Sequence, residues 1–198
     1  MSEAQRRSGV SRTSDMRDAE LAALAQAGDR EAFGELVKRY NAGARRVARA
    51  VLGNPEDADD AAQDGLLAAL RHLGRYDPNR PFGPWLMRIV ANAATDRMRR
   101  RRVRAAEVIP VTMATGEPGP DREADRSALH VALRQALATL PERQRMAVVL
   151  FDVEGYTHGE IADVLGIPVG TVRSHVFHAR RALRTALAPW KDWKEETP

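Results

Sequence analysis

The sequence contains no cysteine and no long apolar run. Without cysteine the chain can form neither disulfides nor thiolate metal sites, and a reducing cytoplasm is the expected compartment. The longest apolar run, Met146–Phe151, is far shorter than the roughly 20 residues that cross a bilayer. Residues 1–16 contain no apolar stretch of the kind found in a secretory signal. These absences predict a cytoplasmic protein without a membrane segment.

Sequence features of an active site are also lacking. The chain has no Gly-rich phosphate loop and no convincing cluster of carboxylates or histidines. His175 and His178 have a spacing that could mimic a metal pair, but no third ligand is evident nearby. We therefore expect a protein that is not an enzyme and needs no cofactor or metal.

What the sequence does contain is clustered positive charge. The formal net charge is +4, and the segment Arg97–Arg104 holds six arginines in eight residues. A second basic segment, Gly166–Leu187, carries four arginines and two histidines. Clustered arginine points to a nucleic-acid partner. By contrast, Glu56–Asp64 holds five acids and no base, which suits either a protein-docking surface or a plain solvated helix start.

The spacing of apolar residues predicts helices and no persistent β-type alternation. In the first helical region, 17–104, Asp29 is expected to cap a helix, and Gly53-Asn54-Pro55 is a strong stop signal. Tyr76–Pro84 is expected to be a loop before a helix that begins at Trp85, because three prolines in seven residues cannot lie inside a helix. Residues 1–16 are polar and without periodicity, which predicts a disordered tail.

Periodicity vanishes over residues 105–126, where prolines and glycines mark a flexible linker. This linker is acidic, with five acids against two arginines. A second helical region begins at Ser127 and ends near residue 188, and a short unpatterned tail, 189–198, follows. The fold class is therefore predicted to be all-α, with two small helical domains, 17–104 and 127–188, joined by the flexible linker.

The second domain contains the pattern of a helix-turn-helix motif. Thr157 and Glu160 have capping-box spacing, and Gly166 can end the first helix in the left-handed conformation. Pro168 then starts a second helix whose apolar stripe is Val172, Val176, Ala179, Leu183 and Leu187. The other side of this helix can face the major groove, where arginine pairs with guanine and an apolar ring meets a thymine methyl group. An ordinary solvated helix face is the alternative interpretation.

A second candidate DNA surface lies at Arg97–Arg104 and just upstream of it. Tyr76, Phe82, Trp85 and Asn92 precede this run. Aromatic rings next to a basic surface suit single-stranded DNA, because bases stack on the rings. The alternatives are that the arginines form a solvated helix end and that Phe82 and Trp85 belong to the core.

Together these pieces resemble the bacterial extracytoplasmic-function (ECF, group 4) RNA polymerase sigma factors of the sigma-70 family. The likeness covers nearly all of residues 17–188 and is carried by "EAFGELVKRY", "EDADDAAQDGLLAAL", "FGPWLMRIVANAATDRMRR" and, most specifically, "LPERQRMAVVLFDVEGYTHGEIADVLGIPVGTVRSHVFHARRAL". It implies that the first domain, region 2 of the family, binds core RNA polymerase and melts and holds the −10 promoter element. The second, region 4, would read the −35 element as duplex. The implied partners are the β and β′ subunits of core polymerase, promoter DNA and, as a family expectation, an anti-sigma factor.

The resemblance also implies site residues. Those expected to meet the polymerase are Asp57, Asp60, Gln63, Asp64 and Leu67. Those expected at the −10 element, where Tyr76 and Asn92 would surround a flipped base, are Tyr76, Asn79, Arg80, Arg88, Asn92, Asp96, Arg97, Arg99 and Arg100. Those expected at the −35 element are Thr171, Arg173, Ser174, His175, Phe177, His178 and Arg181. The sequence departs from the family at His175 and His178, where arginine is frequent, and at Gly65, where a bulkier residue is usual.

A function of another class remains open at this point. The chain could be a stand-alone helix-turn-helix transcriptional regulator that binds duplex operator DNA, with the first domain as a sensor. Such a regulator binds paired half-sites by itself. A sigma factor is instead expected to bind DNA weakly until polymerase is present.

Overall fold

The structure, a computed structural model, describes residues 16–107 and 123–190, without the side chains of 104–107 and 123–127. All regular elements in these residues are helical, as the sequence predicts, and the described part of the chain contains no strand. The predicted N-terminal tail up to residue 15, residues 108–122 of the predicted linker and residues 191–198 lie outside the described residues.

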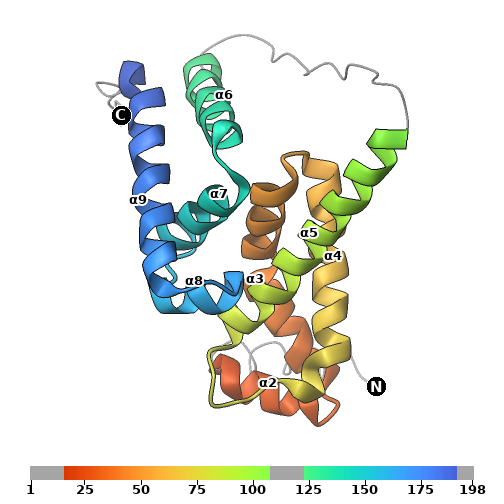
Figure 1. Ribbon diagram of the computed structural model, residues 1–198. Helices are drawn as coiled ribbons and strands as arrows, with labels where there is room; N and C mark the ends of the chain where they lie inside the picture. The colour runs from red at the N-terminus through yellow and green to blue at the C-terminus, as the bar shows by residue number, and fades with distance from the viewer. Residues whose placement is uncertain (1–15, 108–122, 191–198) are drawn as a thin grey trace.

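Four α-helices build the first unit: α2 (Asp18–Gln26), α3 (Arg30–Leu52), α4 (Pro55–His72) and α5 (Phe82–Glu107). Helices α3, α4 and α5 pack against one another, and α2 lies across the start of α3 (Figure 1). The predicted caps are confirmed, because the Asp29 side chain accepts hydrogen bonds from the backbone N–H groups of Glu31 and Ala32. Asn54 caps α4 in the same way, with Pro55 as the first helical residue.

The loop before α5 is shorter than predicted. Helix α5 begins at Phe82, not at Trp85, so Pro84 lies in its first turn. Proline is tolerated there because the first N–H groups of a helix have no acceptor within the helix. Gln26 of α2 holds the start of the loop, since its side-chain amide donates to the carbonyl oxygens of Leu73 at 2.8 Å and Tyr76 at 2.9 Å.

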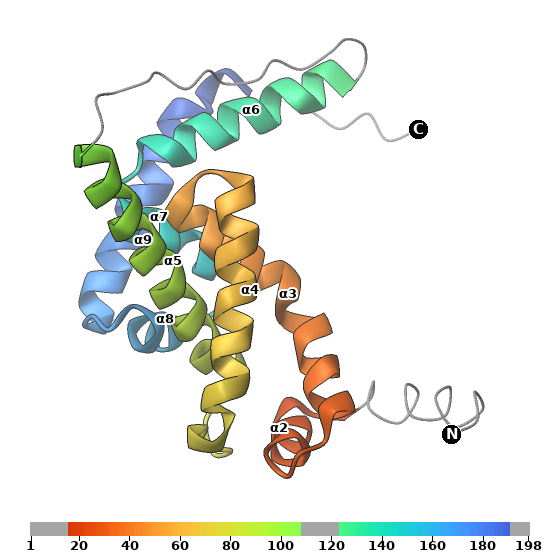
Figure 2. The same ribbon diagram turned by 90° about the vertical axis from the view of Figure 1, so that its right-hand side faces the viewer.

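The second unit consists of α6 (Glu123–Thr139), α7 (Glu142–Val148), a π-helical turn (Val149–Val153), α8 (His158–Leu165) and α9 (Val169–Ala186). Helix α6 packs beside α9 at the end of the molecule away from α2 (Figures 1 and 2). Helix α6 begins four residues before Ser127, the predicted start, and α5 runs on to Glu107. Helices therefore extend into both ends of the predicted linker.

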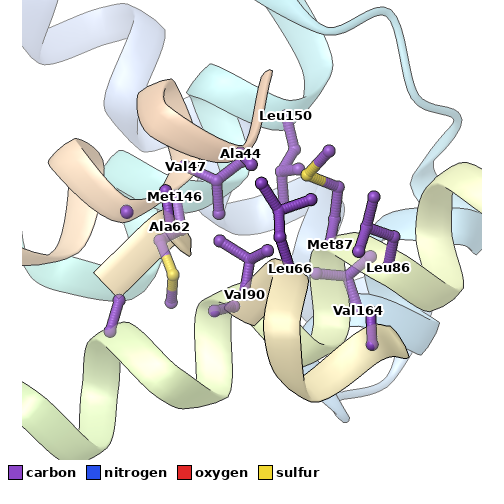
Figure 3. Close-up of a cluster of buried hydrophobic side chains, with 14 of the residues drawn as sticks. Ala44, Val47, Ala62, Leu66, Leu86, Met87, Val90, Met146, Leu150 and Val164 are labelled. Atoms are coloured by element: carbon purple, nitrogen blue, oxygen red, sulfur yellow. The ribbon is translucent and has the colours of Figure 1, made fainter. Parts of the chain in front are cut away.

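The two helical units share one hydrophobic core (Figure 3). Leu66 and Met87 of the first unit lie in the same buried cluster as Met146, Leu150 and Val164 of the second. Helix α7 contacts α3, and α8 contacts α5. The units are therefore packed against each other in this structure, which the sequence pattern did not indicate.

Polar contacts join the same two units. The Arg46 guanidinium of α3 donates to the Glu154 carboxylate, with Nε 2.5 Å from Oε1. Arg145 of α7 donates to the backbone carbonyl oxygens of Ala50 and Val51 near the end of α3. Burial lowers the pKa of Arg145. These contacts satisfy charged groups at the seam between the units, where an unpaired one would be costly.

Candidate nucleic-acid and protein interfaces

The helix-turn-helix motif forms as the sequence predicts. Thr157 caps α8 by accepting from the backbone N–H of Glu160 at 3.3 Å, and the Glu160 carboxylate accepts from the Thr157 N–H at 2.8 Å. Gly166 ends α8 with φ 63° and ψ 39°, a left-handed conformation that favours glycine. Val172, Val176 and Ala179 of α9 are buried, which turns the opposite side of α9 outward.

The outward side of α9 presents most of the residues predicted to meet the −35 element. Thr171 and His175 are half-buried, and the exposed ones are Arg173, Ser174, Phe177, His178 and Arg181. Phe177 is 62% exposed, an unusual state for a large apolar ring on a monomer. Burial lowers the pKa of His175, and the positive charges of Arg143 and His178 lower it further.

A groove beside α9 gathers further basic residues. It is lined by Phe151, His158, Arg173, Val176, Phe177, Arg180, Arg181 and Arg184. Arg180 is held in place, because its guanidinium pairs with Asp152 and lies 4.9 Å over the Phe151 ring. Arg173, Arg181 and Arg184 have no ion pair within the part of the chain described by the structure.

Three basic residues of this groove, His158, Arg180 and Arg184, were not among the residues expected at the −35 element. Arg184 lies three residues after Arg181, on the same side of the helix, so helical spacing alone would have found it. His158 comes from α8, and only the packing of α8 against α9 brings it into the groove.

On α5, four of the residues predicted at the −10 element come together. A groove of about 470 Å³ between α4 and α5 contains Asn92, Asp96, Arg97 and Arg100, together with Asp64, Ala68, His72, Ile89 and Ala93. Asn92 is exposed and has a free amide for a base edge within the described part of the chain. Arg88 and Arg99 are also exposed on α5, and Arg99 lies 3.5 Å from Asp96 of its own helix. Nothing in the sequence had indicated that His72 and Ile89 line this groove.

The structure places Tyr76, Asn79 and Arg80 apart from that groove. Tyr76 is only 4% exposed, and its ring packs on Phe82 and Trp85. Its hydroxyl donates to the Arg80 carbonyl at 2.5 Å, and burial raises its pKa. In this conformation Tyr76 supports the loop and offers no ring face to a base. Asn79 and Arg80 are exposed in the loop, and Asn92 lies ten residues, or about 15 Å, along α5 from Phe82.

The residues predicted to meet the polymerase form a stripe on α4. Asp60, Gln63, Asp64 and Leu67 are exposed, and Asp57 is half-buried. Leu67 and the nearby Leu70 are each 48% exposed, so the stripe ends in an apolar patch. An exposed apolar patch next to acids suits a protein partner.

The acidic stripe and the basic end of α5 lie side by side. Arg97 Nη2 is 2.7 Å from Asp60 and its Nε is 3.3 Å from Asp57. Arg101 Nη1 is 3.1 Å from Asp57. The sequence predicted two separate surfaces, one for polymerase and one for DNA, and gave no sign that they meet.

Gly65 accounts for the close approach of these two helices. It is buried on α4, and a Cβ atom at this position would lie 2.9 Å from the Cα atom of Val90 on α5. No side chain fits without moving backbone. The departure from the family at Gly65 therefore has a local reason in this chain.

The described residues contain no group of three or more histidines, cysteines, aspartates or glutamates placed to hold a metal ion. None of the helices described is both long enough and apolar enough to span a bilayer.

The chain matches known proteins over both helical units. The family model for sigma-70 region 2 matches residues 36–104, and that for sigma-70 region 4 matches residues 130–183. The chain is 41% identical to the ECF RNA polymerase sigma factor SigM of Mycobacterium tuberculosis over 86% of this chain and 84% of SigM. It is 36% identical to the RNA polymerase sigma factor CnrH of Cupriavidus metallidurans over 84% of this chain and 92% of CnrH.

A solved structure resembles the fold as well. CnrH in complex with the cytosolic domain of CnrY superposes with a TM-score of 0.66 at 31% identity, covering 87% of this chain and 97% of the solved one. Because both sigma regions match this one chain, a stand-alone regulator is not favoured. The chain belongs to the sigma-70 family of RNA polymerase sigma factors, among its ECF members.

Proposed function

We propose that this protein, as a group 4 sigma factor, binds core RNA polymerase in the cytoplasm and directs it to a specific set of promoters. The observation that carries this proposal is the presence of two exposed cationic surfaces, on α9 and on α5, beside an acidic helix. In this proposal the protein catalyses no covalent step. It selects the start site and stabilises opened DNA.

The α9 surface reads the −35 element as duplex. An α-helix fits the major groove, and residues in its first turns reach base edges. Arg173 and Ser174 lie there, and Phe177 one turn later can contact a thymine methyl group. Arg181, Arg184 and His178 lie farther along the helix, where phosphate contacts fix its register.

The α5 groove holds the −10 strand after opening. Extruding a base costs a few kcal/mol of unstacking, and a pocket that binds the base offsets this cost. Asn92 supplies both donors and an acceptor for a base edge. Arg88, Arg99 and Arg100 surround it with positive charge for the strand's phosphates. Asn79 and Arg80 extend this surface toward the start of α5.

The stripe on α4 docks on the polymerase. Its acids suit a basic partner, and Leu67 adds apolar contact area. We assign this contact to β′ and a contact of the second unit to β. We also propose a regulatory protein that holds the factor inactive, because CnrH was solved bound to the cytosolic domain of another protein, CnrY.

Promoter binding requires the packed units to separate. Two DNA elements one and a half to two turns apart are separated by roughly 50–70 Å. The predicted linker, 105–126, would span at most about 75 Å if it were wholly extended at roughly 3.4 Å per residue. Because α5 runs to Glu107 and α6 begins at Glu123, the 15 residues between them span at most about 51 Å. Once α7 and α8 leave α3 and α5, the reach is sufficient if this segment is nearly stretched and the two domains add to the span.

The test of the function is reconstitution with polymerase. The purified chain is mixed with core RNA polymerase, co-purification is measured, and transcripts from fragmented genomic DNA are mapped. We expect a stable complex and start sites that share two sequence elements at a fixed spacing. A chain that ignores core polymerase, yet binds paired duplex half-sites alone, would instead be the stand-alone regulator.

A further inference from the structure

We infer that the acidic face of α4 holds Arg97 and Arg101 away from DNA in the free protein, and that polymerase bound to this face releases them. This inference rests on the proposed function, since it joins the polymerase stripe of α4 to the strand-binding surface of α5. We call the group Asp57, Asp60, Asp64, Arg97 and Arg101 the α4–α5 ion cluster.

The Arg97 guanidinium is directed entirely at carboxylates of α4. Its Nη2 donates to Asp60 at 2.7 Å, and its Nε donates to Asp57 at 3.3 Å. Its remaining nitrogen, Nη1, lies 3.9 Å from Asp64. All three nitrogens of this side chain therefore face an acid, so its positive charge is already compensated by carboxylates of α4.

Arg101 lies one turn after Arg97 and shares the same acid. Its Nη1 donates to the second oxygen of Asp57 at 3.1 Å. Both oxygens of Asp57 are therefore occupied by arginines of α5. Arg99, between them in the chain, forms an ion pair with Asp96 of its own helix at 3.5 Å and with no acid of α4 among the described residues. The basic run is therefore divided between arginines that face α4 and arginines that do not.

This pairing matters for nucleic-acid binding because phosphate contacts depend on free positive charge. An arginine adds to affinity, and to its salt dependence, when it replaces counterions condensed on the phosphates. An arginine already neutralised by a carboxylate adds neither until the ion pair breaks. The free protein therefore presents fewer effective charges to DNA than the six arginines of residues 97–104 suggest.

The cluster is accessible to a competing partner. The side chains of Asp60 and Asp64 are 61% and 68% exposed, so a basic group on polymerase reaches them without unfolding the helices. Exposed ion pairs contribute little to stability, so exchanging one cation for another is easy. Coupling of this kind is reciprocal, and DNA that engages Arg97 therefore leaves the carboxylates open to polymerase.

A purely structural role for the cluster makes different predictions. If the ion pairs only fastened α4 to α5, removing the acids would lower stability and leave DNA binding as it was. The two helices are already held together by the close approach of Gly65 to Val90 and by buried side chains such as Ala62 and Leu66. The ion pairs are therefore not needed to define this packing.

The first experiment measures binding of the free full-length chain to a short fluorescent single-stranded oligonucleotide over a range of salt concentrations. The variant is Asp57→Asn with Asp60→Asn. The matched control is Glu31→Gln with Glu56→Gln, which removes the same charge from exposed residues that form no ion pair in the part of the chain described by the structure.

We expect the Asp57/Asp60 variant to bind several-fold more tightly than the control, with a steeper salt dependence. Each released arginine should add about 0.7 to the slope of log affinity against log salt for a single strand. If the slopes of variant and control agree, the arginines are not held back and the inference is wrong.

The second experiment keeps the inference testable should the double variant fold poorly. Arg97→Gln frees Asp60 and should bind core polymerase several-fold more tightly than wild type when no DNA is present. Arg102→Gln, a loss of the same charge from the same helix, is the control. Equal polymerase affinity in both variants overturns the coupling. The proposed function is tested separately. It is wrong if the wild-type protein never directs polymerase to a start site.

Discussion

Single side chains of α9 carry the proposed reading of the −35 element. Arg173 is exposed and has no ion pair in the described part of the chain, whereas Arg180 is paired with Asp152. We expect Arg173→Ala to cost about 1–3 kcal/mol of promoter discrimination, the worth of one bidentate contact to a base. Transcription from single-base variants of the −35 element measures this loss.

Arg180→Ala is the matched control for that measurement, because it removes the same group two turns farther along α9, where the guanidinium is paired with Asp152. It should leave base preference at every −35 position close to wild type. If Arg173→Ala also leaves the preference unchanged, Arg173 makes no base contact.

His175 gives the second unit a predictable response to pH. Burial lowers the pKa of His175, and the positive charges of Arg143 on α7 and His178 on α9 lower it further. The unfolded chain therefore binds this proton more readily than the folded one, and the free energy of unfolding should fall as pH drops below about 6.5. Urea unfolding at several pH values should show a weaker decline for His175→Gln. Parallel curves for both proteins would assign the pH response to other groups.

At the residue scale, the sequence predicts which side of its own helix a side chain lies on. It does not predict the contacts that the side chain makes with a second helix. The inward stripe and outward face of α9 follow from spacing within α9 itself, and both are found. The burial of Tyr76 depends on Phe82 and Trp85, and the pairing of Arg97 depends on α4. Periodicity within one segment holds no information about such partners.

At the scale of elements, the contact between α4 and α5 depends on Gly65. Alanine normally stabilises a helix relative to glycine by about 1 kcal/mol. At Gly65 the added Cβ would lie 2.9 Å from the Val90 Cα atom, and overpacking of this kind costs about 1–3 kcal/mol. We expect Gly65→Ala to lower the free energy of unfolding, as measured by urea denaturation.

Gly34 of α3 provides the control for this substitution. A Cβ at Gly34 has no neighbour within 4 Å, so Gly34→Ala should raise the free energy of unfolding by up to about 1 kcal/mol. If both substitutions raise the free energy of unfolding, α4 and α5 adjust to the added Cβ atom. The close approach at Gly65 then does not limit the side chain at this position.

The ends of the elements were predicted where capping residues specify them. Asp29, Thr157 and Gly166 act within a few residues of themselves, and all three are found in the predicted roles. The start of α5 was misplaced because Pro84 was taken as a helix breaker. Proline breaks a helix interior but not a first turn, and sequence position alone did not show which of these applied.

At the scale of the whole molecule, the all-α class was evident from the sequence, but the contact between the two units was not. The residues that join them are far apart in the chain, as Arg46 and Glu154 are. Buried residues such as Met146 and Leu150 were recognised as apolar, yet their spacing does not show which unit they pack against.

The joint between the units predicts how the molecule opens. Arg46 pairs with Glu154, whose side chain is only 10% exposed, next to Gly43, where a Cβ atom would lie 2.7 Å from that carboxylate. Arg46→Glu places two like charges in this tight space, and like charges at close range disfavour contact. We expect α7 and α8 to leave α3 and α5 in this variant, because a separated unit relieves the repulsion while the linker keeps the chain intact.

Small-angle X-ray scattering measures this opening as an increase in the radius of gyration of Arg46→Glu over wild type. The double variant Arg46→Glu with Glu154→Arg restores an attractive pair in the reverse direction, and it should return the radius to the wild-type value. Return of the radius to the wild-type value would show that the ion pair specifically holds the units together. Two substitutions that only destabilised the protein would increase the radius more than one. Because an open molecule no longer spends free energy on separating its units, Arg46→Glu should also bind core polymerase more tightly. An unchanged radius in the single variant would show that the apolar core alone, through residues such as Leu150 and Met87, keeps the units together.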